Sequence, residues 1–348
     1  MPKDNENILF LGDEPLSPSE PLGFTPDQMV RCEECLRANP PTRLSCLYCA
    51  ATLPVNENTT DLIKPLLSPV ENWAQGFNNI FLPQAIEPDS ETLSQAARLL
   101  KVDTNELSRV MGFGTPLPLA RTATFDEASL VTRRLEALGL QTRIISDEDL
   151  ALKESPPVRL RAMTFDKVGL TPRRISDSEE YRISWNKLVL LVTGRLFNQR
   201  VEISERKSGR GESEIVDASE FVTDEVVLDL YAEQPRINFR ISANGFDFSC
   251  LTEKKMIAAE NFALLLRTIR EKATSADFDE SYNSCRQALE IAWPAGSQTG
   301  SRGWRRQRPG KISIGAVTEN SNEVQFTRYS RLRYCLKVKS SSDDVGTQ

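Results

Sequence analysis

Four cysteines near the N-terminus constrain the fold of this chain more than any other feature. Cys32 and Cys35 form one Cys-x2-Cys pair, Cys46 and Cys49 form a second, and ten residues separate the pairs. Each pair can direct two thiolates at one ion, and two pairs complete the tetrahedron of sulfur ligands that zinc favours. We therefore expect one structural zinc ion, which holds together residues 29–54 although this segment is too short to bury a core.

Two other interpretations of these cysteines stay open. An iron ion accepts the same four thiolates, because ligand spacing alone does not separate iron from zinc. The pairs could alternatively be unrelated to each other, or work as redox dithiols. The three remaining cysteines are scattered along the chain, and the odd total of seven argues against a disulfide framework.

The pattern Cys-x2-Cys-x3-Asn-x6-Cys-x2-Cys, with Asn39 as its asparagine, lies within residues 30–52. This segment resembles the Ran-binding-protein type of zinc finger, and the resemblance implies a zinc site. Val30 departs from the family, which usually has a tryptophan at this position. A generic bacterial zinc ribbon has nearly the same spacing, so the two finger types stay as alternatives.

The family resemblance leaves the ligand of the finger open. Members that bind ubiquitin have Thr-Phe after the second cysteine, where this chain has Leu36 and Arg37. Members that bind single-stranded RNA use arginines and an exposed aromatic residue between the knuckles, which are the two Cys-x2-Cys turns. Arg37 and Arg43 match these arginines, but no aromatic residue occupies the expected position.

No histidine occurs among the 348 residues, which removes the commonest general base and every histidine-ligated metal site. Since no other constellation of catalytic groups is evident, we expect a protein that is not an enzyme. The net charge of −6 argues against a general affinity for polyanions. No apolar run approaches the roughly 20 residues of a membrane-spanning helix. The N-terminus also lacks a basic region followed by an apolar core, so a cytoplasmic protein without membrane contact is expected.

The pattern of the whole chain predicts a multidomain α+β protein. Its expected parts are a disordered acidic arm at 1–28, a zinc finger at 29–54, a linker at 55–72, a small α/β domain at 73–150, a barrel with C-terminal helices at 155–294, and a basic, partly disordered tail at 295–348. The acidic arm has five prolines and a net charge of −5, a composition that does not support a packed core.

Helix-start signals divide the small α/β domain into helices and strands. Asp89, Asp103 and Thr124 are residue types that cap helix N-termini, and apolar residues follow them at helical spacing. The predicted order is β-α-α-β-α-β. In this order residues 75–148 resemble the fold shared by the C-terminal domain of the bacterial ribosomal stalk protein and the ClpS protease adaptor; a ferredoxin-like half-domain is the alternative. The acidic residues after the last strand, from Asp147 on, are expected in a solvated loop.

The block at 155–294 contains short β-type segments joined by turns, which argue for an antiparallel barrel or sandwich, and then two amphipathic helices. Residues 157–275 resemble a pleckstrin-homology-type barrel with its C-terminal helix. The basic loop by which some members bind phosphoinositides is matched only by Arg173 and Arg174, and acidic residues follow directly, so no lipid binding is expected. The predicted strands are 158–165, 181–185, 188–197, 200–205, 225–231, 236–241 and 245–250.

The C-terminal tail combines basic and aromatic residues. Positions 302–339 hold ten basic and two acidic residues. Basic side chains neutralise phosphates and aromatic rings stack on bases, so the tail is a candidate nucleic-acid or partner contact together with Arg37 and Arg43 of the finger. Its candidate contact residues are Trp304, Arg305, Arg306 and Arg308.

Two structural outcomes for the tail are open. Alternating apolar residues predict a strand that docks on a sheet edge; they are Leu332, Tyr334, Leu336 and Val338. The tail could otherwise stay extended and bind in trans. For the whole chain we expect a zinc-binding adaptor that contacts a protein partner, and a nucleic-acid-binding protein is the alternative.

Overall fold

The computed structural model describes residues 24, 29–54, 65, 67, 69–71, 74–85, 88–150, 156–173, 182–207, 213–233, 238–308 and 311–343. They belong to two compact units, Met1–Lys64 and Pro65–Gln348. The acidic arm predicted at 1–28 lies outside the described residues except for position 24, and so do residues 55–64 of the predicted linker.

The first unit has a very small core. Its strands β1 (Val30–Arg31) and β2 (Ala38–Asn39) form an antiparallel pair. Its buried apolar residues are Val30, Cys32, Cys46 and Leu53. Ordering a residue costs about 1–2 kcal/mol of backbone entropy, and four buried side chains cannot offset this cost over the whole finger. The unit therefore needs a further stabilising interaction.

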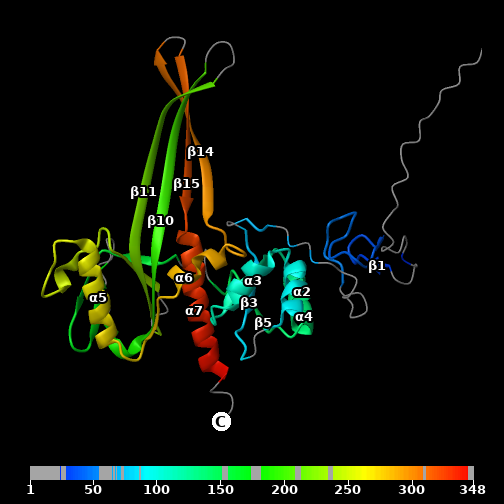
Figure 1. Cartoon of the computed structure of the whole chain (residues 1–348), viewed down its shortest axis with the longest axis horizontal. Helices are drawn as coiled ribbons and strands as arrows, with labels where there is room; N and C mark the ends of the chain where they lie inside the picture. Colours follow the sequence, from blue (N-terminus) through cyan, green and yellow to red (C-terminus); the bar gives the residue numbers. More distant parts are fainter. Residues whose placement is uncertain are drawn as a thin grey trace, which may run out of the picture. The chain divides into compact units, whose positions relative to one another are not determined.

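Residues 77–146 of the second unit form a three-stranded antiparallel sheet with three helices. The central strand β3 (Phe77–Phe81) pairs with β4 (Leu117–Thr122) on one side and with β5 (Thr142–Ser146) on the other. The helices are α2 (Ser90–Leu100), α3 (Thr104–Met111) and α4 (Phe125–Ala137). The order is β-α-α-β-α-β, as the sequence predicts (Figure 1).

Each of these helices begins at the capping residue that the sequence indicates. The side chains of Asp89, Asp103 and Thr124 accept hydrogen bonds from backbone N–H groups two or three residues further on, at 2.7, 2.8 and 3.2 Å respectively. The bonds satisfy N–H groups that have no partner within a helix. These local signals therefore position all three helices correctly.

Asp147 differs from the prediction, because it is buried and not in a solvated loop. Its Oδ2 lies 2.5 Å from Nη2 and 3.1 Å from Nε of Arg121. It also accepts hydrogen bonds from the backbone N–H of Gly76 (3.0 Å) and from the amide of Asn78 (2.9 Å). The loop prediction failed because the charge that neutralises this carboxylate comes from another strand, β4.

The rest of the second unit contains ten further strands and three helices among the described residues. The strands are β6 (Val158–Leu160), β7 (Ala162–Phe165), β8 (Gly169–Arg173), β9 (Ile183–Ser184), β10 (Leu188–Lys207), β11 (Ser213–Ala232), β12 (Asn238–Ser242), β13 (Asp277–Asp279), β14 (Gly296–Arg308) and β15 (Lys311–Ser321). The helices are α5 (Ala258–Lys272), α6 (Tyr282–Leu289) and α7 (Glu323–Asp343). One sheet has the order β14-β15-β10-β11-β12-β6, with β13 also paired to β10, and another has the order β7-β8-β9.

The predicted closed barrel is wrong, since the sheets built by the described part of 155–294 are open. The reason lies in β10 and β11, which have 20 residues each and run past the body of the unit. Their outer halves pair with each other, and the outer half of β10 also pairs with β15, so they do not curve round to close a barrel. Asn198 and Gln199, which resembled a turn between two strands, continue β10 without a break. The predicted strand at 245–250 is also wrong, because Asp247 forms only an isolated bridge with Ala162 and residues 248–250 form a 3-10 turn.

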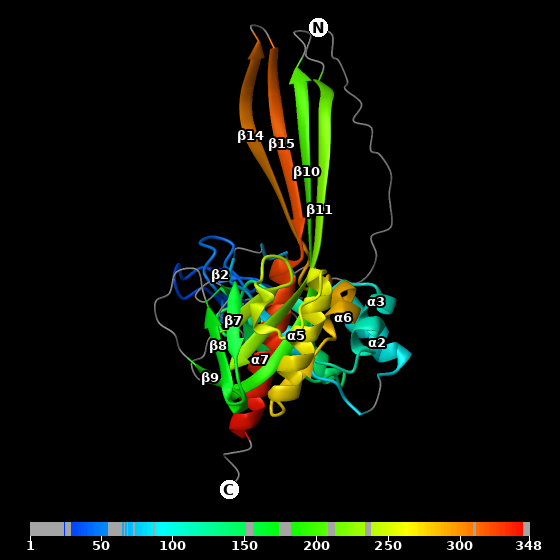
Figure 2. The same cartoon turned by 90° about the vertical axis from the view of Figure 1, so that its left-hand side faces the viewer.

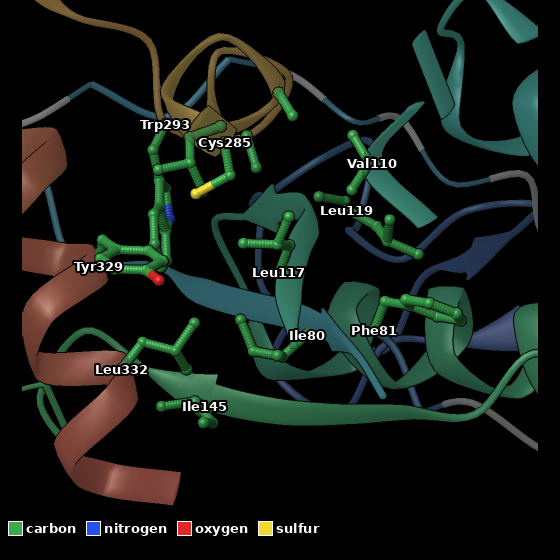
Figure 3. Packing of buried hydrophobic residues seen from close by; sticks show 14 of the residues in the cluster. Ile80, Phe81, Val110, Leu117, Leu119, Ile145, Cys285, Trp293, Tyr329 and Leu332 are labelled. Atoms are coloured by element: carbon green, nitrogen blue, oxygen red, sulfur yellow. The ribbon is translucent and has the colours of Figure 1, made fainter. Parts of the chain in front are cut away.

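The prediction of a strand at 332–338 is also wrong, because these residues lie in α7. Every residue from Phe326 to Leu332 is buried. A helix that is covered on all sides has no apolar stripe of helical period, so the sequence pattern could not identify it. Figure 3 shows Tyr329 and Leu332 packed with Trp293, Cys285 and Ile145. The α/β region and the C-terminal helices therefore share one core.

Buried charges also fix α7 to the main sheet. Arg240 of β12 and Asp229 of β11 form a bidentate ion pair, with distances of 2.7 and 2.9 Å. From α7, the Ser330 hydroxyl donates to Oδ2 of Asp229 (2.7 Å) and Oγ1 of Thr327 accepts from Nη2 of Arg240 (3.1 Å). Glu323 of α7 also accepts from Nη1 of Arg240 (3.4 Å), so without α7 this buried pair would lack three of its hydrogen bonds, and the helix and the sheet depend on each other.

Four strand segments extend beyond this core, and we call them the arm (Figures 1 and 2). The arm consists of residues 198–207 of β10, residues 213–226 of β11, and the strands β14 and β15. Much of the predicted tail is thus ordered β-structure. None of the described helices is both long enough and apolar enough to cross a lipid bilayer.

Candidate metal centre

The four N-terminal cysteines converge on one point. Sγ of Cys32 lies 3.6 Å from Sγ of Cys49, Sγ of Cys35 lies 3.5 Å from Sγ of Cys46, and all four sulfurs lie within 4.8 Å of one another. Zinc–sulfur bonds of about 2.3 Å in a tetrahedron give sulfur–sulfur distances of roughly 3.8 Å. The observed separations span this value, so the four side chains fit one tetrahedral metal ion.

The two knuckles repeat the same backbone geometry fourteen residues apart. In each, the N–H of the first cysteine donates to the carbonyl five residues later, and the N–H four residues later donates back to the cysteine carbonyl. These bonds are Cys32 N to Arg37 O (3.0 Å), Leu36 N to Cys32 O (2.9 Å), Cys46 N to Ala51 O (2.8 Å) and Ala50 N to Cys46 O (3.0 Å). The repeat turns both pairs of sulfurs towards the same point.

Both knuckles also need a left-handed residue directly after their second cysteine. Leu36 has a φ of 58° and Ala50 a φ of 60°. Glycine adopts this conformation freely, whereas another L-residue is destabilised there by about 1–2 kcal/mol. Neither position holds a glycine, so both knuckles contain local strain that the metal site must overcome.

Asn39 joins the two knuckles from the inside of the finger. Its side chain is fully buried. The amide nitrogen donates to the Arg37 carbonyl (3.0 Å) and to Sγ of Cys46 (3.4 Å), and the amide oxygen accepts from the backbone N–H of Leu47 (2.8 Å). The asparagine that supports the family resemblance thus has a structural role, because it orients a sulfur ligand and fixes the spacing between knuckles.

The pKa values of Cys46 and Cys49 are shifted in opposite directions. Desolvation opposes ionisation of Cys46, but hydrogen bonds from the N–H groups of Tyr48 and Cys49 and from neighbouring side chains lower its pKa to about 6. For Cys49 the N–H of Ala51 favours the thiolate, but desolvation and the other three cysteines prevail and raise the pKa to about 12. Without a cation the cluster therefore retains protons, which a bound metal ion displaces.

Large side chains that the core does not use are exposed at the surface of the finger. Leu36, Leu47 and Tyr48 are 62%, 54% and 55% exposed. The guanidinium carbon of Arg37 lies 4.6 Å from the centroid of the Tyr48 ring. We call these four residues the finger face. Tyr48 was missed at the sequence level because it lies inside the second Cys-x2-Cys turn and not between the knuckles.

The other candidate contact residues have different surroundings. Arg43 is exposed, and its Nε donates to the carbonyl of Ser45 (3.3 Å). The tail candidates all lie on β14 of the second unit, whereas Arg37 and Arg43 belong to the first unit. Their register partners on β15 are Ile314 for Trp304, Ser313 for Arg305, Ile312 for Arg306 and Lys311 for Arg308.

The three remaining cysteines do not form a second centre among the described residues. Cys285 is fully buried in α6, and burial raises the pKa of its thiol to about 12. Burial likewise raises the pKa of Cys250 to about 11. Cys335 lies on α7, with its Sγ 3.2 Å from the carbonyl oxygen of Asp149. Thiols held in the protonated form are poor nucleophiles and poor metal ligands.

Comparison with known proteins adds no relative to this geometry. No protein-family model matches the chain, and neither the curated proteins nor the solved structures contain a match to it. The metal centre and the finger face therefore have to be interpreted from their own chemistry.

Proposed function

We propose that this protein is a non-enzymatic zinc-binding adaptor, whose N-terminal finger recognises a protein partner through the finger face. The observation that carries this proposal is Leu36, which is 62% exposed on a left-handed backbone. Burial does not favour leucine there, and the backbone disfavours it. Strained, exposed apolar residues of this kind are typical of binding sites.

The composition of the finger face supports a protein partner. Tyrosine and arginine are enriched among the residues that contribute most to protein–protein binding, because they combine a large apolar area with a polar group. Arg37 follows Leu36 in the chain and stacks on Tyr48, so the contact joins side chains from both knuckles. The surface is small, and the affinity expected from it alone is modest.

Zinc is the metal that best explains the donor set. Four thiolates in a tetrahedral arrangement suit zinc, and iron is the competing ion with the same ligands. When bound, zinc supplies fixed geometry and no open coordination position, because protein fills all four. We infer a structural ion that keeps the strained knuckles folded.

The absence of catalytic chemistry is also part of the proposal. The sequence has no histidine to act as a general base. A pocket of about 190 Å³ beside β3 and α3 is lined, among the residues described there, by apolar and uncharged side chains. These residues are Phe81, Pro83, Gln84, Pro88, Leu93, Ser108, Met111, Gly112 and Gly114. A turnover activity that persists after zinc removal would contradict an adaptor role.

The test compares two glycine substitutions at equivalent positions of the knuckles. Leu36→Gly removes the exposed side chain and relieves the left-handed backbone, and Ala50→Gly relieves the same strain without removing a large side chain. Both variants should retain zinc. Quantitative pull-down from cells should lose the same proteins with Leu36→Gly and Tyr48→Ala, and keep them with Ala50→Gly. An unchanged set of bound proteins in all three variants would contradict the proposal.

Nucleic-acid binding is the second candidate, and the Arg37–Tyr48 stack favours it. An exposed ring beside a guanidinium can stack on a base while the arginine neutralises a phosphate, and Arg43 adds a further charge. This function predicts binding to single-stranded oligonucleotides that weakens steeply with salt. Binding that is unaffected by Arg37→Ala with Arg43→Ala, or that has no salt dependence, would exclude it.

A further inference from the structure

The two outer strands of the arm are open along most of their length. β14 pairs with β15 on one side only. Residues 213–225 of β11 pair only with β10, since the Val226 carbonyl accepts from the Ala243 N–H (2.9 Å) and the pairing of β11 with β12 begins at Val227. No further strand covers either edge in the part of the chain that the structure describes. An open edge presents unpaired N–H and C=O groups that can accept another strand.

Both edges are long and free of proline, although each carries charged residues and β14 has two register irregularities. Each edge is 13 residues long, and neither contains a proline, the residue that most directly blocks pairing. Phe221 and Val222 on β11 are 56% and 63% exposed. Successive residues of a strand point to opposite faces, so both faces of β11 are uncovered at this point.

The charges of the two edges are opposite. β14 contains four arginines and no acidic residue, whereas residues 213–225 of β11 contain five acidic residues and no basic one. The inner strand β15 has one charge of each sign, Lys311 and Glu319. The acidic residues of β11 are Glu214, Asp217, Glu220, Asp224 and Glu225. Of these, Asp224 already forms an exposed ion pair with Arg195 (2.8 Å).

We propose that the arm mediates self-association, in which β14 of one copy pairs with residues 213–225 of β11 of a second copy. Three antiparallel pairings separate β14 from β11 in the arm, so these two strands run in opposite directions. A second arm that points the same way therefore presents its β11 antiparallel to β14, and the sheet continues across the contact. Opposite charges fix the choice of edge, because β14 against β14 or β11 against β11 would place like charges together.

The contact is heterologous, since it joins two different surfaces of the same chain. Each added copy leaves one basic and one acidic edge open, so the assembly grows until it closes as a ring or continues as an open chain. This inference does not depend on the finger, and a variant with a disrupted metal site is expected to assemble normally.

The acidic N-terminal segment is the main competing occupant of the β14 edge. Its negative charge fits, but it has five prolines within 28 residues, and proline cannot donate to a sheet. It would also leave the β11 edge open. A contact between two copies covers one edge of each kind, β14 of one copy and β11 of the other, which is why we favour it.

The test is sedimentation velocity of the full chain at low ionic strength, after nuclease treatment. The wild type should form species larger than a monomer that dissociate as salt is raised, since charge contacts at a surface are screened over about 10 Å at 0.1 M salt. Two triple variants reverse one edge each: Arg302→Glu, Arg305→Glu, Arg306→Glu on β14, and Glu214→Lys, Asp217→Lys, Glu220→Lys on β11. Each triple variant alone should associate at least about tenfold more weakly than the wild type.

Mixing the two triple variants is the decisive part of the experiment. The acidic β11 of the first variant meets the basic β14 of the second, and the reversed edges also match each other, so the mixture should regain association. A control with the same change of net charge as the β14 variant should behave as the wild type; it is Arg98→Glu, Lys101→Glu, Arg109→Glu, in α2, at its C-cap and in α3.

Four results would overturn the proposal. They are a wild type that stays monomeric at low salt, a mixture that fails to regain association, assembly that disappears on nuclease treatment, and assembly that disappears when residues 1–28 are deleted. The last two would identify nucleic acid or the N-terminal segment as the occupant of the edge.

Discussion

Arg37 and Tyr48 join the two knuckles of the finger at its surface, with the guanidinium carbon 4.6 Å from the ring centroid. A cation–π contact at an exposed site contributes only about 0.5–1 kcal/mol. It cannot hold the finger together, and the sulfur cluster, in which Cys32 and Cys46 are buried, has that role together with Asn39. The surface pair is therefore available for recognition, while the interior maintains the fold.

Asn39→Ala should weaken the metal site without removing a ligand. The substitution breaks three hydrogen bonds that connect the knuckles, including the one to Sγ of Cys46. Loss of such supporting contacts typically lowers metal affinity about 10–100-fold. Competition with a chromophoric chelator measures the change. Glu34→Ala, an exposed position of the same finger, is the matched control and should retain wild-type affinity.

Asp229→Asn should destabilise the second unit strongly. It leaves the buried Arg240 without its closest carboxylate, since Glu323 lies further away at 3.4 Å, and breaking a buried pair from one side costs about 3–5 kcal/mol. Urea unfolding followed by circular dichroism gives the difference. Glu233→Gln removes one partner of the exposed Lys187–Glu233 pair and should cost less than about 1 kcal/mol. Equal effects of the two substitutions would contradict the buried network.

Gly194→Ala should loosen the packing of α7. A Cβ at this position of β10 would lie 2.6 Å from Cε2 of Phe326 and 2.8 Å from Cδ1 of Tyr282. Overpacking of this kind destabilises a core by about 1–3 kcal/mol. Thermal unfolding measures the loss, and adding Phe326→Leu should restore part of it by making space. A Gly194→Ala variant as stable as the wild type would mean that α7 does not pack there.

Local signals in the sequence predicted the local structure well. The cysteine spacing predicted a cluster of four sulfurs, and the structure places these sulfurs within 4.8 Å of one another. The residue types of Asp89, Asp103 and Thr124 predicted the starts of three helices, and each of these side chains caps a helix. In each case a few adjacent residues determine the outcome, because a knuckle or a cap is satisfied within a short segment.

Long-range contacts explain what the sequence did not predict. Asn198 and Gln199 resemble a turn, but partners on β11 and β15 hold them in an extended strand. The alternating apolar residues of α7 resemble a strand, but a helix buried on all sides loses the amphipathic pattern by which helices are recognised. The sequence around Asp147 predicts a solvated loop, but Asp147 is buried because it pairs with Arg121 of β4. Each answer depends on a partner that is distant in the chain.

The metal content of the purified full-length chain tests the central claim most directly. We predict about one zinc ion per chain by inductively coupled plasma mass spectrometry, and almost none in the Cys32→Ser variant, because a four-thiolate site depends on every ligand. A chain without zinc, a chain that holds iron in its place, or a Cys32→Ser variant that retains the same zinc would contradict the account.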